Sequence, residues 1–204
     1  SMHQPMYIPW IPYFVKLVHS DVMVFFDNVQ YPRSKNYINR NYIKTTSGPS
    51  LLTVSIKKRS SLSNINEIEI DNKINWQKKH WKSISLNYKK SKYFNLFKND
   101  FEKLYLNKKW NLISDLNIAL IKLLCQLCNI ETKFYNSSEI PVFNISTDQY
   151  IIDIIKYLKG NIYITGIGEG SMRHIKKKYY IENGIILKKF TYDAVQYDQM
   201  YGEF

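Results

Sequence analysis

The chain has 204 residues, of which 45% are hydrophobic, and this composition is typical of a folded globular domain rather than a disordered segment. It carries 29 Lys and Arg against 17 Asp and Glu, so its formal net charge of +12 favours anionic partners such as nucleotides, phosphates or an acidic carrier protein. No apolar run approaches the ~20 residues of a membrane-spanning helix, and no leader sequence is recognisable, so we expect a cytoplasmic protein.

An ordered loop is predicted for residues 2–10, because Pro5 and Pro9 lack an N–H group and fix their own backbone. Four of its side chains can hydrogen-bond a ligand: His3, Gln4, Tyr7 and Trp10. A helix over 12–19 and an apolar strand over 22–26 should follow, with Asp27 at the end of the strand. This order is typical of an α/β protein that binds its ligand at the carboxyl edge of the sheet. A rigid aromatic loop that only packs against the core would have the same sequence features.

Basic residues interleaved with tyrosines and asparagines follow in residues 28–44: Arg33, Lys35, Arg40 and Lys44. Such a cluster can bind a diphosphate, since arginine fits phosphate bidentately and lysine supplies a point charge. It can also stack on single-stranded nucleic acid, or it can be a solvated basic hairpin. Because basic residues are spread along the whole chain, we do not expect a dedicated nucleic-acid binder. Strands are predicted at 51–57 and 67–70.

From residue 76 to about 127 the apolar spacing becomes helical, and three successive helices are predicted. His80 lies on the aromatic stripe of the first helix, where a histidine is usually a packed structural residue. Cys125 and Cys128 form a C-x-x-C motif inside the third helix. No further metal ligands occur at suitable spacing, so we predict free thiols and no metal site.

The second informative region is residues 161–187, which we predict to form strand, glycine-rich turn, helix and strand. A strand at 132–135 and a helix at 146–160 precede it. Backbone N–H groups of the turn would lie at a helix N-terminus, which is a suitable anion site, with Thr165 and Ser171 as hydroxyl donors. The turn lacks the acidic residue of a dinucleotide-binding motif at the required distance, so a nicotinamide cofactor is not expected. An ordinary tight connection that binds nothing is the alternative.

Together these patterns predict a single α/β domain over 1–204, with a mostly parallel, Rossmann-like sheet. The helices at about 75–128 would form a helical insertion, subdomain or lid on it. We expect the loop around His3 and the glycine turn to meet at the same edge of that sheet and to hold an anionic substrate there.

Several short motifs resemble the WbqC-like family, which is associated with bacterial surface-polysaccharide (O-antigen, lipopolysaccharide) biosynthesis. The residues that carry the resemblance are His3-Gln4-Pro5, Tyr7, Pro9-Trp10, Lys16, Asp21, Asp27, Asn39-Arg40, Ile43-Lys44, Gly48, Leu52-Thr53-Val54, Trp76, His80, Thr165-Gly166, Tyr197 and Gln199. The sequence departs from the family pattern at Ile11-Pro12, Ser55 and Thr165, and it stops before the family's last apolar helix.

The resemblance implies a transferase that moves an acyl or aminoacyl group, such as glycyl, to a nucleotide-linked amino sugar. Such a reaction needs a base for the amine and donors for the oxyanion. We expect His3 to be the base and Asp27 to orient it or share its role. Arg40 and Lys44 are expected to bind phosphate groups of the substrate. Thr165, Gly166 and Gly168 are expected to bind either phosphate or the oxyanion. The complete set of expected substrate-binding residues is Gln4, Tyr7, Trp10, Lys16, Asn39, Arg40, Lys44, Thr165, Gly166 and Gly168.

The acyl donor is not identified by the sequence: coenzyme A, a carrier-protein thioester and aminoacyl-tRNA remain open. Direct transfer is favoured over a covalent intermediate because no suitable nucleophilic cysteine occurs, although Ser34 and Ser138 are alternatives. A nucleotidyltransferase, which would release pyrophosphate, and a non-catalytic nucleic-acid-binding protein are the alternative functions.

Overall fold

The computed structural model describes residues 1–33, 36–143, 146–166 and 175–202. The chain divides into two compact units, each with its own hydrophobic core. The first unit comprises Ser1–Gln4, Trp10–Phe26 and Ile130–Ala194. The second comprises Pro5–Pro9, Asp27–Asn129 and Val195–Phe204. Helices and parallel strands together make this an α/β protein, as predicted.

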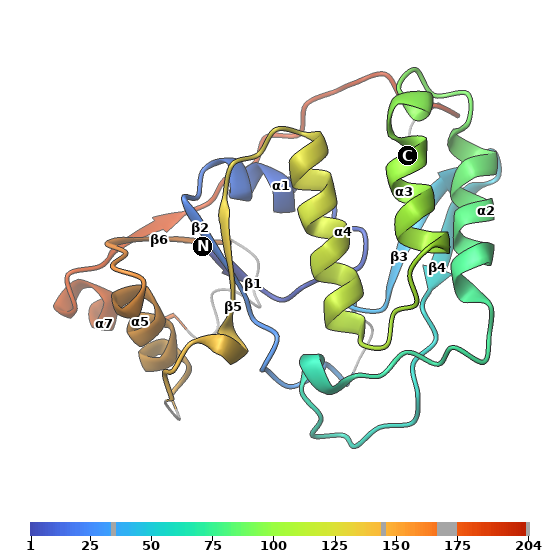
Figure 1. Ribbon diagram of the computed structural model, residues 1–204. Coiled ribbons are helices and arrows are strands. Elements are labelled where there is room, and N and C mark those ends of the chain that lie inside the picture. The colour runs from blue at the N-terminus through green and yellow to red at the C-terminus, as the bar shows by residue number, and fades with distance from the viewer. Residues whose placement is uncertain (34–35, 144–145, 167–174, 203–204) are drawn as a thin grey trace. The chain divides into compact units, whose positions relative to one another are not determined.

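The first unit contains a three-stranded parallel sheet of order β1-β2-β5. Its strands are β1 (Met2–His3), β2 (Val22–Phe25) and β5 (Lys133–Asn136) (Figure 1). Residues 23–25 of the central strand are almost fully buried, which explains its unbroken apolar run. Helix α1 (Ile11–Val18) connects β1 to β2 and has Pro12 in its first turn, where the missing N–H breaks no helical hydrogen bond.

The same unit contains a second pair of parallel strands, β6 (Ile162–Thr165) and β7 (Ile186–Lys189). Helix α7 (Lys177–Glu182) lies between them in the sequence, so the predicted strand–helix–strand order is confirmed. Helix α5 (Thr147–Tyr157) and the short 3₁₀ turn η2 (Ser137–Glu139) precede them. Among the described residues, β6 and β7 pair with each other and not with β1, β2 or β5. One continuous Rossmann-like sheet therefore stays a prediction.

The second unit contains the antiparallel hairpin of β3 (Arg40–Thr45) and β4 (Gly48–Thr53). Gly48 has a φ of 99°, which a side chain would disfavour, and it starts β4 three residues earlier than the sequence indicates. The strand predicted at 67–70 is wrong, because the 3₁₀ turn η1 (Ile65–Glu67) reaches into it. Residues Asn64 and Glu67 form a capping box there, and only isolated bridges follow.

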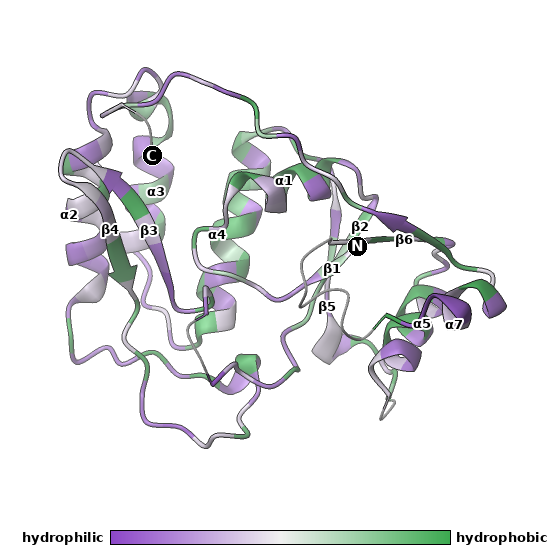
Figure 2. Cartoon of the chain, turned by 180° about the vertical axis from the view of Figure 1, so that it is seen from behind, coloured by the Kyte–Doolittle hydropathy of each residue, from purple (hydrophilic) through white to green (hydrophobic). Residues whose placement is uncertain are grey.

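Three helices complete the second unit: α2 (Trp76–Tyr88), α3 (Phe94–Leu106) and α4 (Ile113–Leu127). They coincide with the three predicted helices, and α2 packs beside α3 (Figure 1). Figure 2 shows hydrophobic and hydrophilic residues interleaved along α4, as expected for a helix with one buried face. Both cysteines of α4 and its C-terminal end are free thiols, Cys125 buried and Cys128 exposed.

The loop Pro5–Pro9 is fixed inside the second unit by two asparagines. Asn117 of α4 is fully buried, and its Nδ2 donates to the carbonyls of Pro5 (2.9 Å) and Ile38 (2.7 Å). Nδ2 of Asn41 donates to the carbonyls of Tyr7 (3.2 Å) and Ile8 (2.6 Å). These bonds hold Ile8 at a φ of 45°, a strained conformation for a β-branched residue.

Candidate functional site

His3 lies at the carboxyl edge of the three-stranded sheet, as predicted. It ends β1 and pairs in register with Phe25, which in turn pairs with Asn136. All three strands run in the same direction, so their carboxyl ends are level at one edge. Open parallel sheets bind their ligands at this edge.

The hydrogen bond at Nδ1 fixes the tautomer of the His3 ring. Nδ1 lies 3.0 Å from the carbonyl oxygen of Gln4, and because a carbonyl only accepts, Nδ1 carries the proton. The ring packs edge-on against Tyr13, with 4.9 Å between the ring centroids. The side chain is half-buried, and within the described part of the chain its Nε2 has no hydrogen-bond partner. Nε2 is therefore an available proton acceptor.

The surroundings of His3 keep the imidazole uncharged. Its pKa is lowered from 6.5 to about 4, first by burial and second by the positive charge of Lys16, while the hydrogen bond to Gln4 acts in the opposite direction. The ring is consequently neutral at pH 7 and can accept a proton at Nε2 without first losing one.

Lys16 supports the strand instead of reaching outward. It is only 4% exposed, and its Nζ donates to the carbonyl of Met2 at 3.2 Å. Burial lowers its pKa to about 8. A side chain enclosed in this way has little surface to offer a ligand, and the substrate contact of Lys16 stays a prediction.

Two further predicted residues lie near the start of the first unit. The carbonyl of Gln4 accepts the hydroxyl hydrogen of Tyr13 at 3.5 Å in addition to the His3 contact. Trp10 immediately precedes α1 and is 67% exposed, so its indole remains available to a ligand. The roles of both side chains in substrate binding stay predictions.

The late glycine turn is described only at its beginning. Thr165 ends β6, is 2% exposed, and donates its hydroxyl to the carbonyl of Gly166 at 3.4 Å. The predicted role of Thr165 as an oxyanion donor is therefore not supported, since its hydroxyl is enclosed. Gly168 and Ser171 lie outside the described residues, and the meeting of this turn with His3 stays a prediction.

In the second unit, two predicted ligand contacts are core residues. Tyr7 is fully buried, and its hydroxyl lies 2.7 Å from both Nδ1 of His80 and the hydroxyl of Tyr105. Asn39 is 4% exposed and is bonded through both amide atoms: Oδ1 accepts from the Tyr31 hydroxyl (2.8 Å) and Nδ2 donates to the Val54 carbonyl (3.0 Å). Both side chains hydrogen-bond the protein itself, and their contacts with the substrate stay predictions.

The two predicted phosphate ligands differ. Arg40 is half-buried, and its Nε donates to Oδ1 of Asn39 at 3.4 Å, so part of the guanidinium remains exposed. Lys44 is 8% exposed, and its Nζ donates to Oε1 of Gln199 (3.0 Å) and to the carbonyl of Gly202. Lys44 therefore anchors the C-terminal segment, and its role in phosphate binding stays a prediction.

Asp27 is the first residue of the second unit after β2. It is 4% exposed, and its carbonyl accepts the N–H of Asn66 at 2.8 Å. Gln4, and not a carboxylate, occupies Nδ1 of His3. A shared catalytic role for Asp27 stays a prediction.

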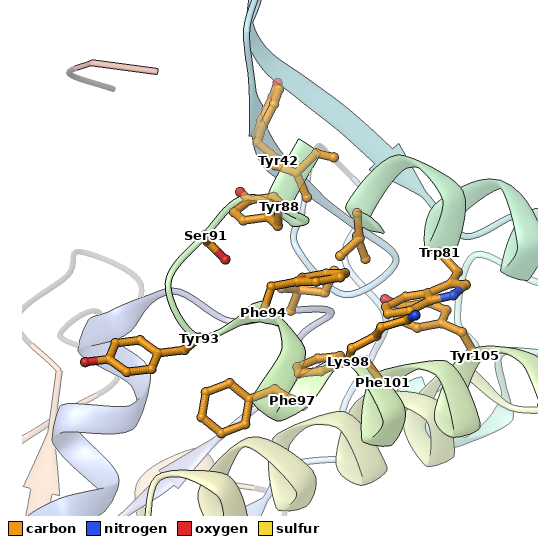
Figure 3. A pocket seen from close by; sticks show the side chains of 13 residues that line it. Tyr42, Trp81, Tyr88, Ser91, Tyr93, Phe94, Phe97, Lys98, Phe101 and Tyr105 are labelled. Carbon is orange, nitrogen blue, oxygen red and sulfur yellow. The ribbon is translucent and has the colours of Figure 1, made fainter. Parts of the chain in front are cut away.

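The sequence did not identify an aromatic pocket in the second unit, a cavity of about 330 Å³. Figure 3 shows its side chains, which come from β3, α2, α3, the connection between α2 and α3, and the Pro5–Pro9 loop. The lining residues are Ile8, Tyr42, Ile43, Trp81, Ile84, Tyr88, Ser91, Tyr93, Phe94, Phe97, Lys98, Phe101 and Tyr105. The only sequence feature that pointed to this pocket was the row of aromatic residues along α3. Their helical spacing predicts a packed helix face but does not predict a cavity.

Within the described ranges, no three His, Cys, Asp or Glu side chains gather closely enough to hold a metal ion. None of the helices in those ranges combines the length and apolar character needed to cross a bilayer. The first unit thus offers the His3 edge as a candidate site, and the second unit separately offers the aromatic pocket.

Comparison with known proteins agrees with the motif pattern. The chain is 27% identical over 203 residues to the uncharacterized protein Rv1507c of Mycobacterium tuberculosis, a match that covers 98% of this chain and 86% of the relative. No solved structure matches significantly. The model of the WbqC-like protein family matches residues 4–204. The chain therefore belongs to the WbqC-like protein family.

Proposed function

We propose that this protein transfers an acyl or aminoacyl group, such as glycyl, to the amino group of a nucleotide-linked amino sugar during the biosynthesis of bacterial surface polysaccharide. The observation that carries this proposal is the state of His3: a neutral ring at the edge of a parallel sheet, with Nδ1 bonded to a carbonyl and Nε2 open.

In the proposed reaction the neutral amine of the sugar attacks the carbonyl carbon of a thioester or ester donor. As the C–N bond forms, the nitrogen becomes acidic, and its proton passes to Nε2 of His3. The C–S or C–O bond of the donor then breaks, and the imidazolium returns the proton to the departing thiolate or alkoxide. A pKa of about 4 suits the second step, because such an imidazolium is a strong proton donor.

The charge of the protein supports an anionic substrate. The chain has a formal net charge of +12, and part of the Arg40 guanidinium is exposed. A diphosphate linked to a sugar is a partner that such a surface attracts. The donor in this proposal is a thioester of coenzyme A or of a carrier protein, or an aminoacyl-tRNA, and a direct transfer needs no covalent intermediate.

The test is a transfer assay with nucleotide-linked amino sugars as acceptors and acyl or aminoacyl compounds as donors, followed by mass spectrometry. His3→Gln should lower product formation at least about 100-fold, the usual range for loss of a general base. His19→Gln changes an exposed histidine of the same unit and should leave the rate unchanged. Both variants should retain the thermal transition of the wild type.

Three results would contradict the proposal. Full activity of His3→Gln would exclude the role of His3. Release of pyrophosphate from a nucleoside triphosphate, with no acylated sugar, would favour the nucleotidyltransferase. Tight binding to single-stranded nucleic acid that falls steeply with salt and is unaffected by His3→Gln would favour the binding protein.

A further inference from the structure

The aromatic pocket has a lining unlike that of an ordinary core. Eight of its thirteen lining residues are aromatic, and only Ile8, Ile43 and Ile84 are aliphatic. Flat rings present faces on which another flat ring can stack, and each base stacked on an aromatic side chain contributes about 1–3 kcal/mol to binding.

The rings of the pocket are themselves ordered in a stack. Trp81 lies between Phe94 and Tyr105, with centroid distances of 6.3 Å on each side and interplanar angles of 13° and 20°. Tyr105 is held in place from behind by the hydroxyl of Tyr7 at 2.7 Å. This wall is already formed without a ligand, so a ring that joins it has little ordering cost.

Other aromatic side chains of the pocket are left uncovered. Phe97 is half-buried and Tyr93 is 57% exposed; both line the pocket, and Tyr93 points away from the packed rings (Figure 3). Leu96, their neighbour on α3, is 68% exposed but does not line the pocket. A bound ligand would cover these exposed rings. Exposed clusters of apolar side chains on a protein surface commonly mark binding sites.

Three polar side chains also lie at the pocket, although most of its lining is apolar. Lys98 is exposed, and no ion pair engages it within the described residues. The oxygen of the Tyr88 hydroxyl accepts the N–H of Lys44 at 2.9 Å, which leaves its hydrogen to donate to a ligand. Ser91 adds a second hydroxyl. A cation for phosphate and two hydroxyls for a base or ribose are thus present.

We propose that this pocket binds a nucleoside phosphate, with the base stacked among the aromatic rings of α2 and α3 and the phosphate near Lys98. The inference names the binding site for the nucleotide part of the substrate, and to that extent it rests on the proposed function. Binding requires no turnover, so it can be measured separately from the transfer reaction.

The test is isothermal titration calorimetry of the whole protein with UMP, CMP, AMP and GMP, together with quenching of tryptophan fluorescence. At least one nucleotide should bind with a Kd below about 1 mM, more tightly than its nucleoside and far more tightly than inorganic phosphate. Phe97→Ala should weaken binding about tenfold, and Lys98→Gln should weaken nucleotide but not nucleoside binding. Leu96→Ala and Lys103→Gln, which change exposed residues of α3 outside the pocket, should have no effect.

Several outcomes would overturn the inference. Equal binding of phosphate and nucleotide, unaffected by Phe97→Ala, would mean a surface anion site. Binding of decanoate but of no nucleotide would mean a pocket for alkyl chains. The absence of any binding at millimolar concentration would also refute it.

The His3→Gln variant separates this inference from the proposed function. It should bind nucleotide like the wild type while it loses transfer. Nucleotide binding without any transfer activity refutes the proposed function and leaves the pocket assignment intact. Transfer to a nucleotide-linked sugar that Phe97→Ala does not change refutes the pocket assignment alone.

Discussion

The hydroxyl of Tyr7 lies 2.7 Å from Nδ1 of His80, although the two residues are 73 positions apart in the sequence. His80 also forms a backbone hydrogen bond with Thr53 that favours its protonated form, so the ring donates to that carbonyl and Nδ1 is left to accept. Tyr7 must then donate to His80 and accept from Tyr105, whose hydroxyl is also 2.7 Å away. The loop, α2, α3 and β4 are thereby joined by one buried chain of hydrogen bonds.

Tyr7→Phe should destabilise the protein by roughly 1–3 kcal/mol, because it leaves Nδ1 of the buried His80 without its donor. The free energy of unfolding in urea, followed by tryptophan fluorescence, measures this, since Trp76, Trp81 and Trp110 all lie in the second unit. The control is Tyr157→Phe, which removes the hydroxyl of a tyrosine that is 54% exposed. Equal stability of the two variants would show that the chain of hydrogen bonds contributes little.

The stability of the second unit should fall as the pH is lowered below about 6.5. Burial lowers the pKa of His80 from 6.5 to about 4, so between these values the unfolded chain binds a proton that the folded chain does not. The contribution of neutral His80 to the free energy of unfolding is fully present above pH 6.5 and is lost as the pH falls toward 4. Between pH 7 and pH 5 the loss should be roughly 2 kcal/mol for this residue.

Urea unfolding at pH 7 and pH 5 checks this sign. His80→Gln should make the dependence of stability on pH shallower over this interval, because it removes one group that binds a proton in the unfolded chain but not in the folded chain. A protein that becomes more stable at pH 5 would contradict the lowered pKa.

The sequence predicted the elements whose pattern is local. Residues 22–26 are a continuous apolar run and form β2, and the helical spacing of 76–127 gives α2, α3 and α4. The strand at 67–70 failed because a capping box at Asn64 and Glu67 stabilises a 3₁₀ turn over the start of that alternating pattern. The hydrogen bonds of the capping box therefore determined the local backbone conformation, and the alternation of apolar residues did not.

The site residues were harder to predict, because the side chains that can hydrogen-bond a ligand can equally hydrogen-bond other residues of the same chain. Tyr7, Asn39 and Lys44 all carry groups suited to a substrate, but each finds its partners within the chain. Those partners lie up to 158 positions away and leave no trace in the local pattern. His3 lies at the predicted edge of the sheet, but the loop predicted for residues 2–10 is wrong at its start, because Met2 and His3 pair with β2 as the short strand β1.

Lys44→Met should release the C-terminal segment. The ammonium of Lys44 donates to Gln199 and Gly202, and hydrogen bonds of a charged donor contribute roughly 1.5–3 kcal/mol each. Amide hydrogens in residues 195–202 should then exchange at least about tenfold faster, as measured by mass spectrometry. The hydroxyl of Tyr201, which donates to the Asn87 carbonyl at 2.6 Å, remains as a second attachment.

The matched control is Lys57→Met, which removes an exposed lysine paired with Glu69 in the same unit. It should leave exchange in residues 195–202 unchanged. If Lys44→Met also leaves it unchanged, and nucleotide binding is weakened instead, Lys44 is a phosphate ligand after all.

Lys16→Met should raise the pKa of His3 from about 4 toward, but not up to, its ordinary value of 6.5. The positive charge of Lys16 disfavours a second positive charge on the ring, whereas burial, the larger cause, remains after the substitution. Titration of the His3 Cε1 proton by NMR measures this directly and needs no substrate. If the protein is a transferase with His3 as base, the acidic limb of its rate profile should move to higher pH by the same amount.

Lys133→Met is the control, because it removes an exposed lysine from β5 of the same sheet. It should leave the titration of His3 as it is in the wild type. A pKa of His3 that stays at about 4 in Lys16→Met would assign the whole effect to burial. A shift in the transfer profile without a shift in the NMR titration would mean that a different residue is the base, since both measurements must report the same proton on Nε2.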